Sequence, residues 1–254
     1  MTSAAAKSRS SARRSPAREL IELYRSLGKR VGALRFGPPI SVTYNPLSYA
    51  WEPFERYLER YAASAPREVL LVGMNPGPFG MVQTGVPFGD VTLVRDWLGI
   101  TGRVDPPKHT HPKRPVLGFD CPRSEVSGTR LWGWARDRFG TPERFFARFF
   151  VANYCPLAFV EESGRNRPPD KLPAAEQQAL FAVCDDALRR VVQVLEPELI
   201  VGIGAFAEKR ARAALGEAAR VGCILHPSPA NPNANRGWAQ VIERQLADLG
   251  VELP

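Results

Sequence analysis

The sequence predicts a single-domain α/β fold in which helices cover both faces of a parallel sheet. Four short apolar runs have the length and composition of buried strands, and segments with helical apolar spacing separate them. Strands that alternate with helices indicate a parallel sheet, because each helix carries the chain back to the same end of the sheet. The expected strands are residues 69–73, 149–153, 199–204 and 221–225.

The expected helices follow from apolar spacing and from flanking prolines. In residues 174–195, Leu180, Cys184 and Leu188 recur every four positions. Pro173 lies at the start of this segment and Pro197 just beyond its end. A proline-containing loop connects the first two helices. Residues 101–123 contain five prolines and are expected to form a long surface loop. The two histidines of this loop, His109 and His111, are expected to be solvated. The other expected helices are residues 18–27, 53–62, 129–139, 205–215 and 238–249.

Composition and charge are typical of a globular protein with a basic balance. The chain has 254 residues, 44% of them hydrophobic, and 34 basic residues against 26 acidic ones give a net charge of +8. Five of the excess positive charges lie in residues 1–18. Residues 1–16 lack apolar spacing and are expected to be a disordered basic tail, with residues 17–254 forming one domain. A basic protein favours polyanionic partners, although net charge alone does not identify one.

Targeting signals are not evident in the sequence. No apolar run reaches the ~20 residues of a membrane span, and no apolar segment of a secretory signal follows the basic N-terminus. We therefore expect no membrane partner. Arginine outnumbers lysine 28 to 6, a usage typical of a GC-rich genome. This bias favours a bacterial cytoplasm, with the nucleus as the alternative in a eukaryote.

No metal or cofactor is expected. The four cysteines are 29 to 39 residues apart, which favours buried reduced thiols over a zinc site, a disulfide framework or an iron–sulfur cluster. The segment Gly202-Ile203-Gly204-Ala205-Phe206-Ala207 fits a dinucleotide-binding fingerprint, but the acidic residue expected about 20 positions later is missing. Glycines that allow tight strand–helix packing are the alternative interpretation. The glycine-rich segment after residue 73 lacks the Gly-Lys-Ser/Thr of a nucleotide triphosphatase loop.

The segments that follow the four strands are the candidate site. In an open parallel sheet, ligands bind outside the carboxyl ends of the strands, so these segments are expected to converge on one cleft. The segments are Gly73-Met74-Asn75-Pro76-Gly77-Pro78-Phe79-Gly80, Asn153-Tyr154-Cys155-Pro156, Gly202-Ile203-Gly204, and His226-Pro227-Ser228-Pro229-Ala230-Asn231-Pro232-Asn233-Ala234-Asn235.

The first and fourth of these segments together resemble the motifs of the single-strand-selective monofunctional uracil-DNA glycosylases. The first continues through Met81 to Gln83-Thr84-Gly85-Val86-Pro87-Phe88-Gly89, and the fourth continues to Gly237-Trp238. The segments Asn153-Tyr154-Cys155-Pro156-Leu157 and Val94-Arg95-Asp96-Trp97-Leu98-Gly99 are also similar to that family. The resemblance covers most of the chain after about residue 20 and implies a central four-stranded parallel sheet flanked by helices.

The resemblance implies the following function. The enzyme would hydrolyse the N-glycosidic bond of uracil, and of 5-hydroxymethyluracil, in single- or double-stranded DNA, and would thereby initiate base excision repair. It would need no cofactor and would act as a monomer. The target base is first flipped out of the base stack. The two motifs contain no lysine that would form a Schiff base with the sugar, which is consistent with a monofunctional enzyme.

The family's site roles fall on matching positions of this chain. Asn75 would orient the attacking water, since an amide cannot act as a general base near neutral pH. His226 would donate a hydrogen bond to uracil O2 as negative charge develops there. Phe88 would stack on the base, and the Asn153 carboxamide would read N3–H and O4. Met74 would supply backbone contacts, and Gly77 would do so while leaving space beside C5.

The segment after His226 resembles the family's DNA wedge. Serine hydroxyls, amides and a cationic side chain suit phosphate contacts. Ala230 departs from the commoner family pattern, in which a larger basic residue fills the space of the flipped base. A methyl group fills little of the vacated stack, so we expect a preference for single-stranded or mispaired uracil over uracil paired with adenine. The expected DNA-binding residues are Ser228, Pro229, Ala230, Asn231, Asn235 and Arg236.

Two alternative functions stay open at this point. One is a glycosylase whose specificity has shifted toward deaminated purines. The other is a non-catalytic α/β domain that binds nucleic acid. A uracil-containing oligonucleotide that is treated with the protein and then with alkali distinguishes the three possibilities.

Overall fold

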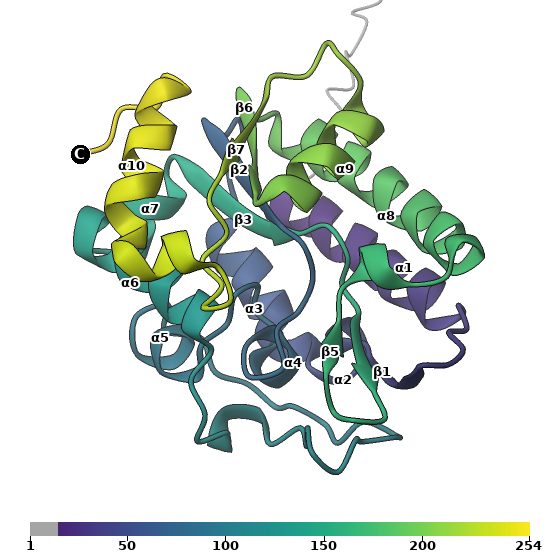
Figure 1. The fold of residues 1–254 in the computed structure, drawn as a ribbon. Helices are drawn as coiled ribbons and strands as arrows, with labels where there is room; N and C mark the ends of the chain where they lie inside the picture. The colour runs from purple at the N-terminus through teal and green to yellow at the C-terminus, as the bar shows by residue number, and fades with distance from the viewer. Residues whose placement is uncertain (1–14) are drawn as a thin grey trace, which may run out of the picture.

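The computed structural model describes residues 15–254, and the described residues contain a four-stranded parallel sheet that confirms the predicted fold class (Figure 1). The order of its strands is β3-β2-β6-β7. Each strand coincides with a predicted apolar run, although β6 and β7 end one residue earlier than expected. The strands are β2 (Val69–Gly73), β3 (Phe149–Asn153), β6 (Leu199–Ile203) and β7 (Val221–Ile224).

Helices cover the parallel sheet from both sides, which explains why its strands are apolar without alternation. In Figure 1, α1 (Pro16–Gly32), α8 (Ala174–Leu195) and α9 (Ala205–Leu215) lie on one side of the sheet. On the other side lie α6 (Val126–Phe139), α7 (Pro142–Phe146) and α10 (Trp238–Asp248). At β3, the Tyr57 hydroxyl of α3 (Trp51–Tyr61) donates to the Val151 carbonyl at 2.8 Å. None of the helices in residues 15–254 is long and apolar enough to cross a membrane.

The first helix is longer than the sequence predicts. It begins at Pro16 rather than at residue 18, with the Ser15 hydroxyl accepting the Arg18 backbone N–H, and it continues to Gly32 rather than ending at residue 27. A serine N-cap followed by proline is a favoured helix start, because both satisfy or remove backbone donors that have no intrahelical partner. The predicted basic tail, residues 1–16, therefore overlaps this helix at its end, and residues 1–14 lie outside the described residues.

A second, antiparallel sheet is absent from the sequence prediction. It consists of β1 (Ile40–Tyr44), β4 (Ala158–Glu161) and β5 (Asn166–Arg167), in the order β1-β4-β5. The prediction of a loop between the first two helices is therefore wrong at residues 40–44. The reason is that β1 is only partly buried and is stabilised by pairing with β4, a segment more than 100 residues away in the chain.

The remaining elements are short and connect the larger ones. The α-helical turns are α2 (Pro46–Tyr49), α4 (Met81–Thr84) and α5 (Val91–Asp96). The 3₁₀ turns are η1 (Gly118–Asp120), η2 (Pro169–Lys171) and η3 (Pro232–Arg236).

Residues 101–123 form the expected long loop, but His111 is not solvated as predicted. Its side chain is buried, and its backbone N–H donates to the Tyr44 hydroxyl at 2.8 Å. Its Nδ1 accepts the Lys113 backbone N–H, so Nε2 carries the proton and donates to the Glu162 carbonyl at 3.0 Å. His111 therefore anchors the loop to the second sheet, whereas His109 is exposed as expected.

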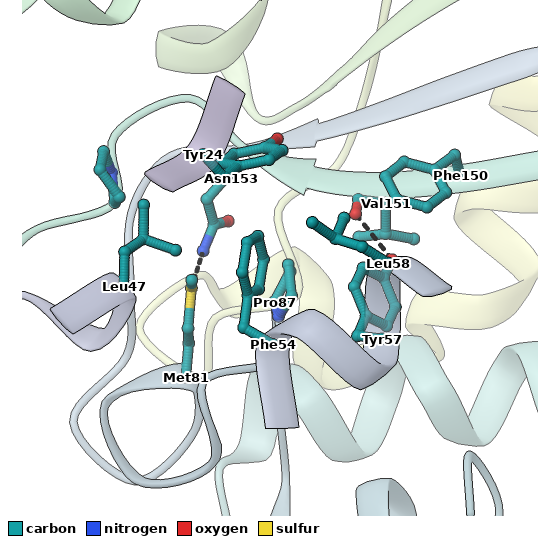
Figure 2. A pocket seen from close by; sticks show the side chains of 11 residues that line it. Tyr24, Leu47, Phe54, Tyr57, Leu58, Met81, Pro87, Phe150, Val151 and Asn153 are labelled. Carbon is teal, nitrogen blue, oxygen red and sulfur yellow. Dashed lines mark hydrogen bonds between the residues drawn. The ribbon is translucent and has the colours of Figure 1, made fainter. Parts of the chain in front are cut away.

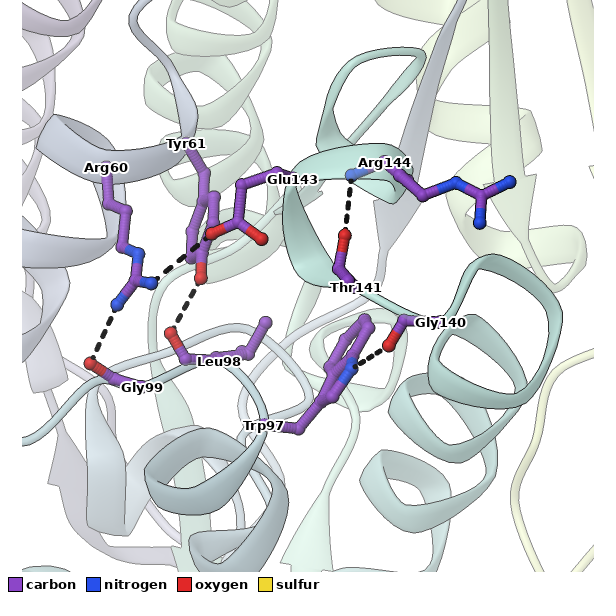
Figure 3. A network of polar contacts seen from close by, with 9 residues as sticks. All are labelled: Arg60, Tyr61, Trp97, Leu98, Gly99, Gly140, Thr141, Glu143 and Arg144. Carbon is purple, nitrogen blue, oxygen red and sulfur yellow. Dashed lines mark hydrogen bonds and ion pairs between the residues drawn. The ribbon is translucent and has the colours of Figure 1, made fainter.

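The family-like segment Val94–Gly99 has a structural role, shown in Figure 3. Trp97 donates its indole N–H to the Gly140 carbonyl at 3.1 Å. The Tyr61 hydroxyl donates to the Leu98 carbonyl at 2.6 Å, and Arg60 bridges the Gly99 carbonyl and Glu143. These contacts tie the end of α5 to α3 and to the α6–α7 connection.

Candidate active site

The carboxyl ends of the four parallel strands lie at one edge of the sheet, as predicted. Gly73 and Asn153 are direct neighbours in the register of β2 and β3. Beyond the strands, Tyr154 N–H donates to the Gly73 carbonyl and Cys155 N–H to the Met74 carbonyl, both at 2.9 Å. The first two motif segments are therefore held together by backbone hydrogen bonds, and Met74 contributes through its carbonyl.

Asn75 is fixed by a hydrogen bond from its side chain to the chain after β3. Its Nδ2 donates to the Leu157 carbonyl at 3.0 Å. This contact orients the carboxamide and leaves Oδ1 as a hydrogen-bond acceptor. The side chain is partly buried, so its acceptor lies near but not inside the core.

Gly73 is a point of contact between Asn153 and Phe88. A Cβ atom at position 73 would collide with Asn153 Oδ1 and would lie 2.7 Å from Phe88 Cζ, so any other residue would displace these two side chains. The Phe88 ring is partly buried, and its backbone has a φ of +54°, a conformation that non-glycine residues adopt rarely. Such an outlier in a folded protein is more frequent at functional sites than elsewhere.

The Asn153 carboxamide has one satisfied and one unsatisfied end. Its Nδ2 lies 3.3 Å from Met81 Sδ, and Figure 2 marks this contact with a dashed line. Its Oδ1 is buried and has no hydrogen-bond partner among residues 15–254. A buried acceptor without a partner costs free energy, about 1–3 kcal/mol, unless a ligand or water satisfies it. The cavity of about 10 Å³ beside Asn153 in Figure 2 is lined by core side chains such as Tyr24, Phe54 and Tyr57, so it is a packing gap within the core and not the place of a pyrimidine.

His226 is held as a neutral imidazole with its proton on Nε2. Its Nδ1 accepts the Ser228 backbone N–H at 3.0 Å, so Nδ1 carries no proton. Burial lowers the pKa of His226 from 6.5 to about 4, because desolvation disfavours the charged ring. The ring lies 6.3 Å from that of Phe88, measured between centroids. The site therefore combines a neutral N–H donor, an aromatic face and an amide.

Gly202 within β6 and Gly204 just after it allow close packing, which is the alternative to a dinucleotide fingerprint. A Cβ at Gly202 would collide with the Glu208 backbone nitrogen and would lie 2.6 Å from Glu208 Cα. Gly204 has a φ of +91°, and a Cβ there would lie 3.0 Å from His226 Cβ. The first glycine thus lets α9 approach β6, and the second leaves room for His226.

Gly77 faces a partly buried carboxylate that the sequence did not indicate. A Cβ at position 77 would collide with Glu125 Oε2 and would lie 2.8 Å from Glu125 Cδ. The same oxygen accepts the Phe79 backbone N–H at 3.2 Å. Burial raises the pKa of Glu125, while the Phe79 and Ser127 N–H groups and Arg123 partly counteract this and Asp90 adds to it. The space predicted beside Gly77 is, in the direction of its Cβ, occupied by Glu125.

The predicted DNA wedge is an exposed loop with an ordered backbone. Pro229, Ala230 and Arg236 are exposed. Ser228 Oγ accepts the Ala230 N–H at 3.2 Å, and Asn231 Oδ1 accepts the Asn233 N–H at 3.1 Å. These internal contacts shape the loop and leave its tip in solvent.

Asn235 differs from the other expected wedge residues because its carboxamide is engaged within the protein. Its Nδ2 donates to the Pro229 carbonyl at 3.1 Å, and its Oδ1 accepts from Arg130 at 2.8 Å. In this structure Asn235 therefore braces the loop, and its amide is not directed at a phosphate.

Four charged residues near the motifs were missed by the sequence analysis. Glu125 and Arg130 belong to the start of α6. Arg123 and Arg114 lie over the ring of Phe79, with the guanidinium carbons 3.9 and 5.3 Å from its centroid. No local pattern marks these residues, because each is brought to the site by contacts with a distant part of the chain.

Comparisons with known proteins identify the family of this chain. The family model of the uracil DNA glycosylase superfamily matches residues 60–249. The chain is 51% identical over 241 residues to the single-strand selective monofunctional uracil-DNA glycosylase of Rattus norvegicus, covering 94% of this chain and 86% of that protein. The protein of the same description from Mus musculus is 50% identical with the same coverage, and that of Bos taurus is 51% identical over 228 residues, 89% of this chain and 84% of that protein.

A solved structure supports the fold independently. The crystal structure of wild-type SMUG2 from Pedobacter heparinus superimposes with a TM-score of 0.68 at 18% sequence identity, covering 94% of this chain and 98% of that chain. The strand-end motifs, the four-stranded parallel sheet and these matches lead to one conclusion: the chain belongs to the uracil DNA glycosylase superfamily, and within it to the single-strand selective monofunctional uracil-DNA glycosylases.

Proposed function

We propose that this protein is a monofunctional DNA glycosylase that hydrolyses the bond between uracil and deoxyribose in DNA and so initiates base excision repair. The observation that carries the proposal is the grouping of three features at one sheet edge. These are the neutral His226 with its proton on Nε2, the unsatisfied Asn153 acceptor and the Phe88 ring. Their chemistry complements a pyrimidine that has been flipped out of the stack.

Base recognition follows from the Asn153 carboxamide. Its buried Oδ1 would accept the uracil N3–H, and its Nδ2 would exchange the Met81 contact for uracil O4. Cytosine presents an acceptor at N3 and a donor at position 4, so the same amide would be mispaired. Phe88 supplies the stacking face, and Met74 supplies backbone contacts.

Bond cleavage would depend on stabilising the leaving base. As the glycosidic bond breaks, electron density passes to the base and negative charge develops on O2. The Nε2–H of His226 is suited to donate to that oxygen, and the low pKa of His226 keeps the ring neutral at physiological pH. A preorganised donor of this kind is worth about 3–4 kcal/mol in the transition state.

The water would be positioned by Asn75. With Nδ2 bound to the Leu157 carbonyl, Oδ1 is the group that would accept a hydrogen bond from the water. An amide does not take up the proton at neutral pH, so water would add after the bond to the base has largely broken. The reaction then proceeds through an oxocarbenium-like sugar, water forms the new C–O bond to give an abasic site, and the proton that the water loses passes to the departed uracil anion or to solvent.

The finer substrate range is part of the proposal. We include 5-hydroxymethyluracil as a second base, and both single- and double-stranded DNA as substrates of a monomeric enzyme. The exposed wedge loop with Ala230 at its tip, together with Arg236 and the cations over Phe79, supports contact with the phosphate backbone.

The test is a product assay on the full-length protein. Labelled oligonucleotides with one uracil, 5-hydroxymethyluracil, cytosine, hypoxanthine or xanthine are incubated with the enzyme and then cleaved with alkali. We expect cleavage at uracil and 5-hydroxymethyluracil, with free base released and no strand break before alkali. Binding without cleavage, or cleavage at the deaminated purines alone, would contradict the proposal. Asn75→Ala, purified in parallel, controls for contaminating glycosylase.

A further inference from the structure

The first two turns of α6 contact the active-site motifs at three points. Near the helix start, Glu125 accepts the Phe79 N–H of the first motif. At Gly128 the helix lies against the Phe88–Asp90 backbone so closely that a Cβ would collide with the Phe88 carbonyl oxygen. At Arg130 it reaches the loop after β7. The last contact has a geometry that bears directly on His226.

Arg130 holds the loop after β7 by two hydrogen bonds. Its Nη1 donates to the Pro227 carbonyl at 2.9 Å, and its Nη2 donates to Asn235 Oδ1 at 2.8 Å. Asn235 in turn donates to the Pro229 carbonyl at 3.1 Å. A planar guanidinium that donates in two directions fixes both position and orientation of its acceptors, which a lysine cannot do. The Arg130 side chain therefore holds the loop at both of its ends, at Pro227 and at Asn235.

The carbonyl that Arg130 binds belongs to the peptide unit that sets the state of His226. The Pro227 carbonyl and the Ser228 N–H are the two ends of one planar peptide group. Arg130 binds the oxygen at one end, and His226 Nδ1 accepts the N–H at the other at 3.0 Å. A charge-assisted bond to the oxygen also polarises the peptide and strengthens its N–H as a donor.

We propose that Arg130 is a positioning residue for the glycosylase reaction: it fixes the Pro227–Ser228 peptide so that His226 keeps its proton on Nε2 and aims it at the base. The inference rests on the function proposed above and assigns Arg130 no contact with the substrate. Through Asn235 the same guanidinium sets the position of the wedge loop. Loss of Arg130 therefore affects leaving-group stabilisation first and DNA penetration second.

The test compares Arg130→Ala and Arg130→Lys with the control Arg136→Ala. Arg136 lies on the same helix and pairs with the exposed Asp137 at 2.9 Å. Two readouts are used: single-turnover rates on single-stranded uracil DNA, and ¹⁵N NMR of the imidazole nitrogens, which reports the tautomer without turnover. The chain has three histidines, and His226→Asn identifies the relevant signals.

We expect Arg130→Ala to lower the single-turnover rate about 100-fold, as misplacement of a catalytic group by about 1 Å does. Its NMR spectrum should show His226 as a mixture of tautomers, Arg130→Lys should be intermediate in both readouts, and Arg136→Ala should match wild type. A wild-type rate and a single Nε2–H tautomer in Arg130→Ala would overturn the proposal. If that variant does not fold, Arg130→Lys decides by the same two criteria. A wild-type enzyme without uracil activity refutes the function instead, and the NMR result still tests the role of Arg130.

Discussion

Acidification should weaken the folded protein through His226, and replacing this residue with asparagine should remove part of that sensitivity. The folded state holds the ring neutral with a pKa of about 4, because the ring is largely buried and its Nδ1 accepts the Ser228 N–H. In the unfolded chain the pKa returns to about 6.5. Between these two values the unfolded state binds a proton that the folded state does not.

The sign and size of the effect follow from this difference. The unfolded state binds more protons below pH 6.5, so the free energy of unfolding decreases as the pH falls through this window. The contribution of His226 to the free energy of unfolding is complete above about pH 6.5 and is lost progressively as the pH falls toward about 4. Each pH unit corresponds to about 1.4 kcal/mol, so going from pH 7 to pH 5 should cost about 2 kcal/mol through His226 alone.

The assay is urea unfolding of wild type and His226→Asn at pH 7 and at pH 5. Asparagine cannot titrate in this range, and its Oδ1 lies where it can accept the Ser228 N–H. All other titratable groups are shared, so the difference between the two proteins isolates His226. Wild type should lose about 2 kcal/mol more than the variant on acidification. Equal losses of unfolding free energy in the two proteins would refute the conclusion that His226 is buried as a neutral imidazole. An NMR titration that gives His226 a pKa near 6.5 would refute it as well.

Three further substitutions test the proposed site. Asn75→Ala should lower the single-turnover rate about 100-fold or more while DNA affinity, measured by fluorescence anisotropy, stays near wild type, since Asn75 orients water; a wild-type rate would contradict this role. Asn153→Asp should lower the uracil rate about 100-fold and create measurable release of cytosine, because one carboxyl oxygen repels O4 but accepts from a position-4 amine, while the other oxygen, when protonated, donates to N3 of cytosine; unchanged base selectivity would show that Asn153 does not read the base. Ala230→Arg should raise the ratio of duplex to single-strand rates about tenfold, because a larger side chain fills the vacated stack and offsets part of the flipping cost; an unchanged ratio would mean that residue 230 is not at the wedge tip.

The local sequence was sufficient to locate the parallel sheet and the motifs at its edge. Each strand of that sheet is a short run without polar residues, apart from Asn153 at the end of β3, and this is the pattern of a strand buried on both faces. Parallel topology then places all four carboxyl ends at the same edge, so the grouping of Asn75, Asn153 and His226 follows from the order of elements. The sequence also predicted both ends of the long helix α8 correctly, because Pro173 and Pro197 flank it.

Tertiary structure alone decided the features that depend on distant pairing. Strand β1 exists because it pairs with β4, and His111 is buried because a loop folds against the second sheet. Glu125 accepts from an N–H donor 46 residues away in the chain, and Arg130 donates to a carbonyl 97 residues away. The sequence by itself determined where the parallel strands end and which motif residues follow them, since apolar runs and motifs are local. Only the packed fold decided how they are held, because charge, tautomer and orientation depend on neighbours that no local pattern specifies.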